Sequence, residues 1–446
     1  MKLAFTLIIS SLLLSIAPLS AQTDQRVYRI IESVEANRIK KDVQALVNFG
    51  TRHTLSDTLS TTTGIGAARR YIKKELDKIS ADCGDCLEVF YQHNFFSKGT
   101  NDRLVKDVDI VNVVAIKRGK KQPNHFIIMS GDIDSRVSDP ADYTSESPGA
   151  NDNASGMAGT IEAARVLSKY DFDNSIIFVG LAGEEQGLFG GKGLAEYAKK
   201  NQWNIIGILN NDMIGNIKGV DGYISNKDFR IFSEPVPVTE SEQARRARRF
   251  YGGEVDGHSR QLARYVHRLT STYMPDMHPI MIYRLDRFGR GGHHRPFNDE
   301  GFAGIRIMEA HENYTQQHQD IRVENGIAYG DTFEHVDFDY AAKLTAVNAI
   351  TLASLAWAPL APETVAIGGI VESSARLQWS AVEEAIGYKL HWRETTAPQW
   401  NHSRYLEGAN EHELDGVVID NFFFGVSAVS KEGHESLVVF PNQILR

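Results

Sequence analysis

Acidic side chains follow three short apolar runs in the middle of this chain. They are Asp132 and Asp134 after His125–Met129, Glu184 and Glu185 after Ser175–Gly180, and Asp212 after Ile205–Asn210. Such runs predict buried strands, and parallel strands present their carboxyl ends at one sheet edge, where ligands bind. Several carboxylates converging at that edge would repel one another unless a cation neutralised them. The pattern therefore predicts a metal site.

A further acidic residue, Asp152, lies in the turn-rich segment Gly149–Gly156, which leads into the helical pattern Ala158–Leu167. Taken singly, each of these aspartates has another explanation, because Asp beside Gly and Ser commonly serves turns and helix caps. The number of acidic residues expected at one edge favours the metal over the turns.

Four segments in this order resemble the M28 family of zinc aminopeptidases and carboxypeptidases. The similar segments are Gly131–Ser135, Gly149–Gly156, Glu184–Glu185 and Asn211–Gly215. The resemblance extends over roughly residues 25–356. It implies a zinc-exopeptidase-like α/β fold, in which a mostly parallel, mixed sheet lies between helices. The strands and helices alternate along this part of the chain, as such a fold requires.

The resemblance also implies a role for each acidic residue. Two divalent metal ions, zinc in this family, are bridged by Asp152, and Glu185 and Asp212 each bind one of them. Glu184 is the general base, and a late histidine completes the ligands. His318 is the expected ligand, although an insertion separates it from the Asp-Thr pair that follows in the family pattern.

Three other histidines, His293, His294 and His311, lie in the same part of the chain. His311 is the alternative to His318 as the late ligand. His294 occupies the position of a family histidine close to the substrate, two residues before Pro296-Phe297, and His293 replaces the acidic residue that normally precedes it. Asp134 is expected beside the metal ligands or the substrate.

The main departure from the family pattern is Asp132, which stands where a zinc-binding histidine is usual. A carboxylate is also an accepted zinc ligand. It adds a negative charge, however, so we expect a weaker Lewis acid at that metal and a preference shifted toward harder ions such as manganese or cobalt.

Amide hydrolysis follows from this ligand set. Zinc lowers the pKa of bound water from about 15.7 toward 7, and Glu184 is placed to transfer the water proton to the leaving amine. Paired metals can also hold a free α-amino group, which favours exopeptidase action. A metallo-aminopeptidase acting on peptides is the leading expectation, and the sequence does not separate it from a carboxypeptidase or dipeptidase. The alternatives are a single-zinc glutaminyl cyclase and a catalytically silent binding protein of the same fold.

The N-terminus of the 446-residue chain is typical of an export signal. Lys2 precedes the apolar segment Leu3–Ile16, and small residues lead to Ala21, where cleavage is expected. This predicts a secreted or periplasmic protein, and no later segment is apolar enough to span a membrane. The formal net charge of -9 is spread along the chain and argues against a nucleic-acid partner.

The only two cysteines, Cys83 and Cys86, are three positions apart. In an oxidising compartment a small loop disulfide is the favoured interpretation over a redox or zinc motif.

The chain divides into residues 1–21 as signal, 22–357 as the catalytic domain and 358–446 as a separate domain. Past Pro359 the pattern changes to short alternating strands, such as Ala375–Ser380 and Gly387–Arg393. This C-terminal segment resembles a fibronectin type III β-sandwich. Because it holds no cluster of catalytic residues, we expect it to dock on the enzyme or to bind a surface.

Overall fold

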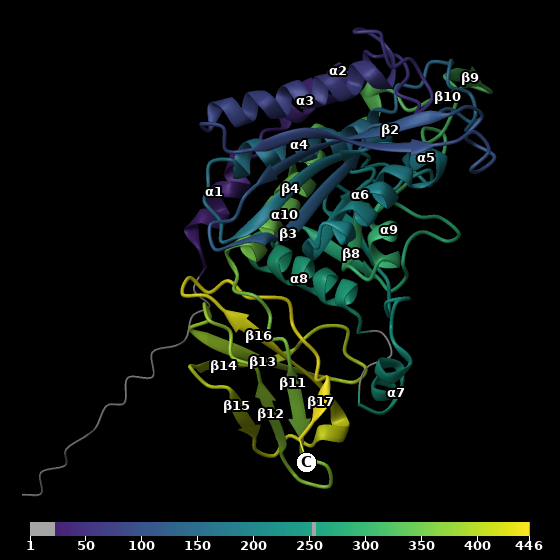
Figure 1. The fold of residues 1–446 in the computed structure, drawn as a ribbon. Coiled ribbons are helices and arrows are strands. Elements are labelled where there is room, and N and C mark those ends of the chain that lie inside the picture. Colours follow the sequence, from purple (N-terminus) through teal and green to yellow (C-terminus); the bar gives the residue numbers. More distant parts are fainter. Residues whose placement is uncertain (1–22, 252–255, 446) are drawn as a thin grey trace, which may run out of the picture.

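The computed structural model describes residues 23–251 and 256–445, so the expected signal segment lies outside the described residues. An eight-stranded sheet packed between helices forms the larger part, and two small sheets lie at its C-terminal end (Figure 1). The large sheet contains β1 (Glu88–Phe96), β2 (Val108–Lys117), β3 (Gln122–Asp132), β4 (Asn174–Leu181), β5 (Asn204–Asn211), β6 (Asp228–Ser233), β7 (His278–Ile282) and β8 (Gly304–Glu309).

The strand order is β1-β2-β4-β3-β5-β8-β6-β7. The four central strands β4, β3, β5 and β8 are parallel to one another, and β7 is parallel to β6. The pairs β1–β2, β2–β4 and β6–β8 are antiparallel. This confirms the expected mixed, mostly parallel sheet. Because β3, β4 and β5 run in the same direction side by side, the residues that follow them emerge at one edge.

Helices cover both faces of the sheet. Successive side chains of the central strands alternate between the two faces: Met129 and Phe178 pack into one apolar core, and Ile128 and Val179 into the other. The helices are α1 (Gln25–Ser33), α2 (Ala36–Val47), α3 (Gly64–Asp82), α4 (Gly156–Leu167), α5 (Glu184–Gly187), α6 (Phe189–Lys200), α7 (Glu242–Tyr251), α8 (His258–Tyr273), α9 (His294–Asp299) and α10 (Phe338–Trp357). None of the helices in the described part of the chain has the length and apolarity that crossing a bilayer requires.

The small loop disulfide expected from the sequence is present. Cys83 follows α3 directly and is bonded to Cys86, just before β1. It joins the end of a helix to the start of the edge strand.

The C-terminal part forms two facing sheets below the large one (Figure 1). One has the order β15-β12-β11-β17 and the other β14-β13-β16, and Trp379, Tyr388 and Val426 lie in the apolar core between them. The strands are β11 (Val365–Gly368), β12 (Ala375–Trp379), β13 (Gly387–Glu394), β14 (His402–Glu407), β15 (Glu411–Leu414), β16 (Phe422–Val429) and β17 (Gln443–Ile444).

Charged pairs join these sheets to the helices of the larger part. Arg268 of α8 lies 2.7 Å from Glu435, and His434 lies 2.9 Å from Asp24, at the start of α1. Asp256 contacts Arg264 and Arg393, each at 2.5 Å. The C-terminal sheets are therefore docked on α8 through ion pairs and on the start of α1 through the His434–Asp24 hydrogen bond.

We expect acid to loosen this contact. Burial alone would raise the pKa of Glu435, but Arg268 and His391 outweigh burial and hold that pKa well below its usual range. The charged form therefore stabilises the folded state above the unfolded pKa of about 4.3, and this contribution is lost as the pH falls toward the lower folded pKa. Urea midpoints measured between about pH 7 and about pH 3 should fall less steeply in Glu435→Gln than in the wild type.

Glu432→Gln is the matched control, because Glu432 is exposed and lies in the same turn. Its acid dependence should equal that of the wild type. Equal slopes in Glu435→Gln and the wild type would contradict the role of Glu435.

Candidate metal centre

The acidic segments meet at the carboxyl edge of the sheet, as the sequence predicts. In the strand register, Gly131 of β3 pairs with Gly180 of β4 and with Asn211 of β5. The three strands therefore end side by side at one edge of the sheet, where Asp132, the loop that leads to Glu184, and Asp212 follow them. The turn that carries Asp152 packs against β3 from the start of α4, where a side chain on Gly131 would collide with Gly156.

Three of the expected ligands form one compact cluster. The Nε2 atom of His318 lies 2.9 Å from Oδ2 of Asp152 and 3.0 Å from Oε1 of Glu185. One ligand atom from each of the three residues lies within 4.8 Å of the other two. Over residues 23–251 and 256–445, this is the one group of three His, Cys, Asp or Glu side chains that meets this criterion.

The electrostatics of this cluster suit a cation. Burial alone would lower the pKa of His318, but the carboxylates of Glu185 and Asp152 outweigh it and raise that pKa to about 9. In return, the positive imidazole holds the pKa of both acids below their usual range. The proton on His318 thus balances charge where a metal ion would bind, and a metal would displace it.

Several residues for which the sequence predicted no role at the metal hold these ligands in place. Arg136 donates to Oε2 of Glu185 at 2.7 Å, and Gln317 donates to Oδ2 of Asp152 at 3.0 Å. Asp331 accepts the backbone N–H groups of Asn151 and Asp152 at 2.8 and 2.7 Å. Arg136 directly follows Asp134-Ser135, and this position was the only feature of the sequence that could have indicated its role.

Asp134 lies directly outside the cluster. Its carboxylate accepts the backbone N–H groups of Glu184 and Glu185 at 3.2 and 3.0 Å, and the hydroxyl of Thr54 at 3.0 Å. These bonds fix the first turn of α5 and so aim the two glutamates. Burial and repulsion from Glu185 raise the pKa of Asp134 to about 7.

Glu184, the expected base, is surrounded by other acids. Burial, followed by repulsion from Glu185 and Asp212, raises the pKa of Glu184 well above its usual range. Such a carboxyl group accepts a proton readily.

Asp132 and Asp212 are engaged by the protein itself. Asp132 lies 2.5 Å from Nδ1 of His293 and accepts a 2.7 Å hydrogen bond from Asn153. Oδ2 of Asp212 lies 2.8 Å from Nη2 of the buried Arg306. The structure does not bring these two aspartates together with Asp152 as a second compact set of ligands. Asp152, Glu185 and His318 fit a metal ion, whereas Asp132 and Asp212 are each bonded to a protein partner through at least one oxygen.

The remaining histidines lie away from the cluster. His311 is 3.5 Å from Asp228 at the start of β6 and is not part of the cluster that contains His318. The ring of His294 is fully buried, with Nε2 2.8 Å from the carbonyl oxygen of Leu285. Its expected position beside the substrate stays a prediction, since its contacts are with the protein interior.

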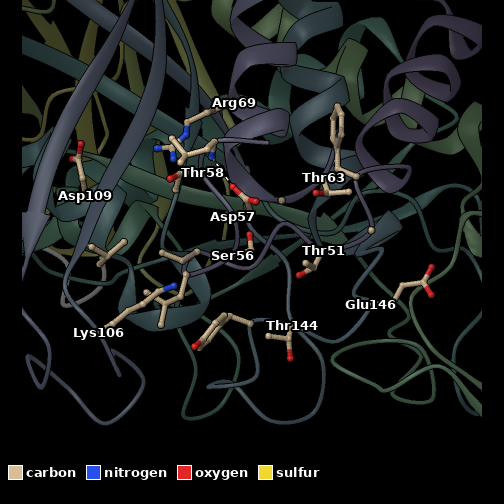
Figure 2. Close-up of a pocket in the computed structure, with 18 of the residues that line it drawn as sticks. Thr51, Ser56, Asp57, Thr58, Thr63, Arg69, Lys106, Asp109, Thr144 and Glu146 are labelled. Atoms are coloured by element: carbon tan, nitrogen blue, oxygen red, sulfur yellow. Dashed lines mark hydrogen bonds between the residues drawn. The ribbon is translucent and has the colours of Figure 1, made fainter. Parts of the chain in front are cut away.

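A cavity of about 960 Å³ is lined by residues that include Thr51, Ser56 and Asp57 (Figure 2). Thr54, which donates to Asp134, is among its lining residues, together with Lys106, Tyr143 and Glu146. None of the clustered carboxylates lines it. Thr54 therefore links the lining of this cavity to Asp134 through a hydrogen bond.

Comparisons with known proteins agree with this fold. The model of "Peptidase family M28" matches residues 112–351. A "Probable zinc metalloprotease" of Pyrenophora teres f. teres is 40% identical over 423 residues, which cover 94% of this chain and 87% of the relative. A "Probable zinc metalloprotease" of Pyrenophora tritici-repentis is 35% identical over 423 residues, which cover 94% of this chain and 98% of the relative.

Solved structures with the same fold are more distant in sequence. The LapA aminopeptidase of Legionella pneumophila matches with a TM-score of 0.54 at 15% identity, over 75% of this chain and 76% of that one. An aminopeptidase of Aneurinibacillus matches with a TM-score of 0.50 at 14% identity, over 74% and 96%. The matching motifs, the family model and the relatives of nearly full length agree, and the chain belongs to peptidase family M28.

Proposed function

We propose that this chain is an exported zinc-dependent exopeptidase that removes N-terminal residues from peptides. The observation that carries this proposal is the compact set of Asp152, Glu185 and His318 beside Glu184. One imidazole and two carboxylates are an accepted set of zinc ligands, and catalytic zinc usually has three protein ligands. The relatives named as probable zinc metalloproteases and the aminopeptidase neighbours support the same activity.

A bound zinc ion supplies Lewis-acid polarisation of the peptide carbonyl and acidifies water. Glu184 accepts the proton of the attacking water and returns it to the leaving amine, which completes the cleavage of the C–N bond. Asp134 positions Glu184 through the backbone of α5. Arg136, by its bond to Glu185, orients one carboxylate of the ligand set.

The number of ions is a separate part of the proposal. The family resemblance implies two, with Asp132 and Asp212 at the second, and manganese or cobalt as candidates beside Asp132. The geometry supports a first ion at His318, and the second position is treated below.

Other features support export and an accessory role for the C-terminal domain. The N-terminal signal pattern and the Cys83–Cys86 disulfide suit a secreted or periplasmic enzyme. The two facing sheets after Pro359 suit a fibronectin type III-like domain that docks on the enzyme. We place the boundary between the two domains at residues 357–358.

Release of free amino acids from matched peptides tests the activity. We expect the enzyme to release the N-terminal residue from unblocked peptides and not from N-acetylated ones. A chelator should abolish this release, and zinc should restore it. Release from the C-terminus of blocked peptides would contradict the aminopeptidase in favour of a carboxypeptidase. Cyclisation of N-terminal glutamine without hydrolysis would identify a glutaminyl cyclase, and neither reaction would identify a silent binder.

A further inference from the structure

Two departures from the family pattern meet in space. Asp132 replaces a histidine and His293 replaces an acid, in motifs far apart along the chain. In the structure, Oδ1 of Asp132 lies 2.5 Å from Nδ1 of His293, and both residues are buried. The carboxyl–imidazole pair is thus present with its members exchanged. An exchange of this kind keeps the charge of the pair but changes which side chain stands at the metal position.

Asp132 is committed to protein partners on both oxygens. Oδ1 contacts His293, and Oδ2 accepts the hydrogen bond from Asn153, whose other amide atom accepts the backbone N–H of Gly156. Asn153 also donates to the carbonyl oxygen of Asn211 at the end of β5. Turning Asp132 toward a metal would break the buried contacts that both of its oxygens make, which is costly in an apolar surrounding.

Asp212 is paired with a permanent positive charge. Nη2 of Arg306 lies 2.8 Å from its Oδ2, and Nη1 lies 3.1 Å from Asp286. Arg306 belongs to β8, and its side chain is fully buried. A guanidinium is charged at every relevant pH. A divalent ion bound by Asp212 would lie beside this charge and be repelled by it. Arg136 lies beside Glu185 in a similar way, but its side chain is 14% exposed and its charge is therefore better screened by water than that of the fully buried Arg306.

We propose that the chain binds one zinc ion, at Asp152, Glu185 and His318, and that Arg306 and the Asp132–His293 pair replace the second ion of the family. This inference refines the proposed zinc-dependent function at the same site. Oδ1 of Asp212 and Nε2 of His293 have no hydrogen-bond partner in the described part of the chain. These two atoms do not form, with a ligand atom of a third His, Cys, Asp or Glu of the described residues, a set in which all atoms lie within 4.8 Å of one another, as those of Asp152, Glu185 and His318 do.

Zinc titration of the metal-free, full-length protein measures the stoichiometry directly. We expect saturation at one zinc per chain, by elemental analysis after removal of unbound metal and by competition with a chromophoric chelator. Two ions per chain would overturn the inference. It would leave the proposed function intact, because amino acid release is measured separately.

Two variants assign the ion. His318→Gln removes a ligand and should weaken zinc binding by more than about 100-fold, since even outer partners contribute about 10- to 100-fold. Asp132→Asn is the matched control at the other position and should still bind one zinc, with an affinity much closer to that of the wild type than His318→Gln has. Loss of the ion in Asp132→Asn would overturn the assignment.

A third variant tests what excludes the second ion. The combination Asp132→His, His293→Asp and Arg306→Met restores the family pair and removes the guanidinium. We expect it to bind two zinc ions per chain, with circular dichroism used to verify that it is folded. A folded variant that still binds one would overturn the proposed role of these residues. The stoichiometry of the wild type decides the inference if the variant does not fold.

Discussion

Glu184→Gln should lower kcat for release of an N-terminal residue by about 100- to 10,000-fold, the usual contribution of a positioned general acid–base group. The amide has nearly the shape of the carboxylate but cannot accept the proton of water. The zinc content should stay unchanged, because Glu184 lies outside the set formed by Asp152, Glu185 and His318. Steady-state kinetics on an unblocked peptide and elemental analysis of the same sample measure both quantities.

Glu196→Gln is the matched control, since Glu196 is exposed on the neighbouring helix α6. Its kcat should equal that of the wild type. Loss of zinc in Glu184→Gln would show that Glu184 is a ligand, and full activity would show that another group transfers the proton.

The sequence was sufficient to predict the edge of the sheet and most of the proposed ligands. Apolar runs such as His125–Met129 are too short for helices and are followed by glycine, so they indicate buried strands. The strands lie where they were expected, in β3, β4 and β5. Because the acidic residues directly follow parallel strands, their convergence is a consequence of the topology and needs no knowledge of distant contacts.

The partners of the ligands could not be predicted in the same way. His293 and Arg306 contact Asp132 and Asp212 from segments that follow much later in the chain. A local pattern shows that His293 is unusual for its motif but not that it contacts Asp132. The same limit applies to His318, which lies in a loop without periodicity, so only a resemblance favoured it over His311. Side-chain pairs of this kind depend on packing that no local signal records.

The docking of the C-terminal sheets was open for the same reason. The alternating strands predicted a small sandwich but not the surface on which it rests. Asp256 precedes α8 and has no motif around it, yet its carboxylate lies 2.5 Å from Arg264 and 2.5 Å from Arg393 of β13. The side chain of Asp256 is 2% exposed, and those of Arg264 and Arg393 are each 3% exposed.

Asp256→Ala is expected to lower the free energy of unfolding by about 3–5 kcal/mol, because it leaves two buried guanidinium groups without their shared counter-ion. The effect exceeds that of losing a surface ion pair, which is about 0–1 kcal/mol. Urea denaturation followed by circular dichroism measures it. We expect the C-terminal sheets to separate first, since Arg393 belongs to them and Arg264 to α8.

Two further variants separate the loss of charge balance from the loss of a side chain. Asp276→Ala, at an exposed position after α8, should change the free energy of unfolding by less than about 0.5 kcal/mol. Adding Arg393→Met to Asp256→Ala should recover part of the loss, because one uncompensated charge is removed and its volume is filled by an apolar chain. A double variant less stable than Asp256→Ala would show that Arg393 stabilises the interface mainly through its stacking over Trp400 and Phe423.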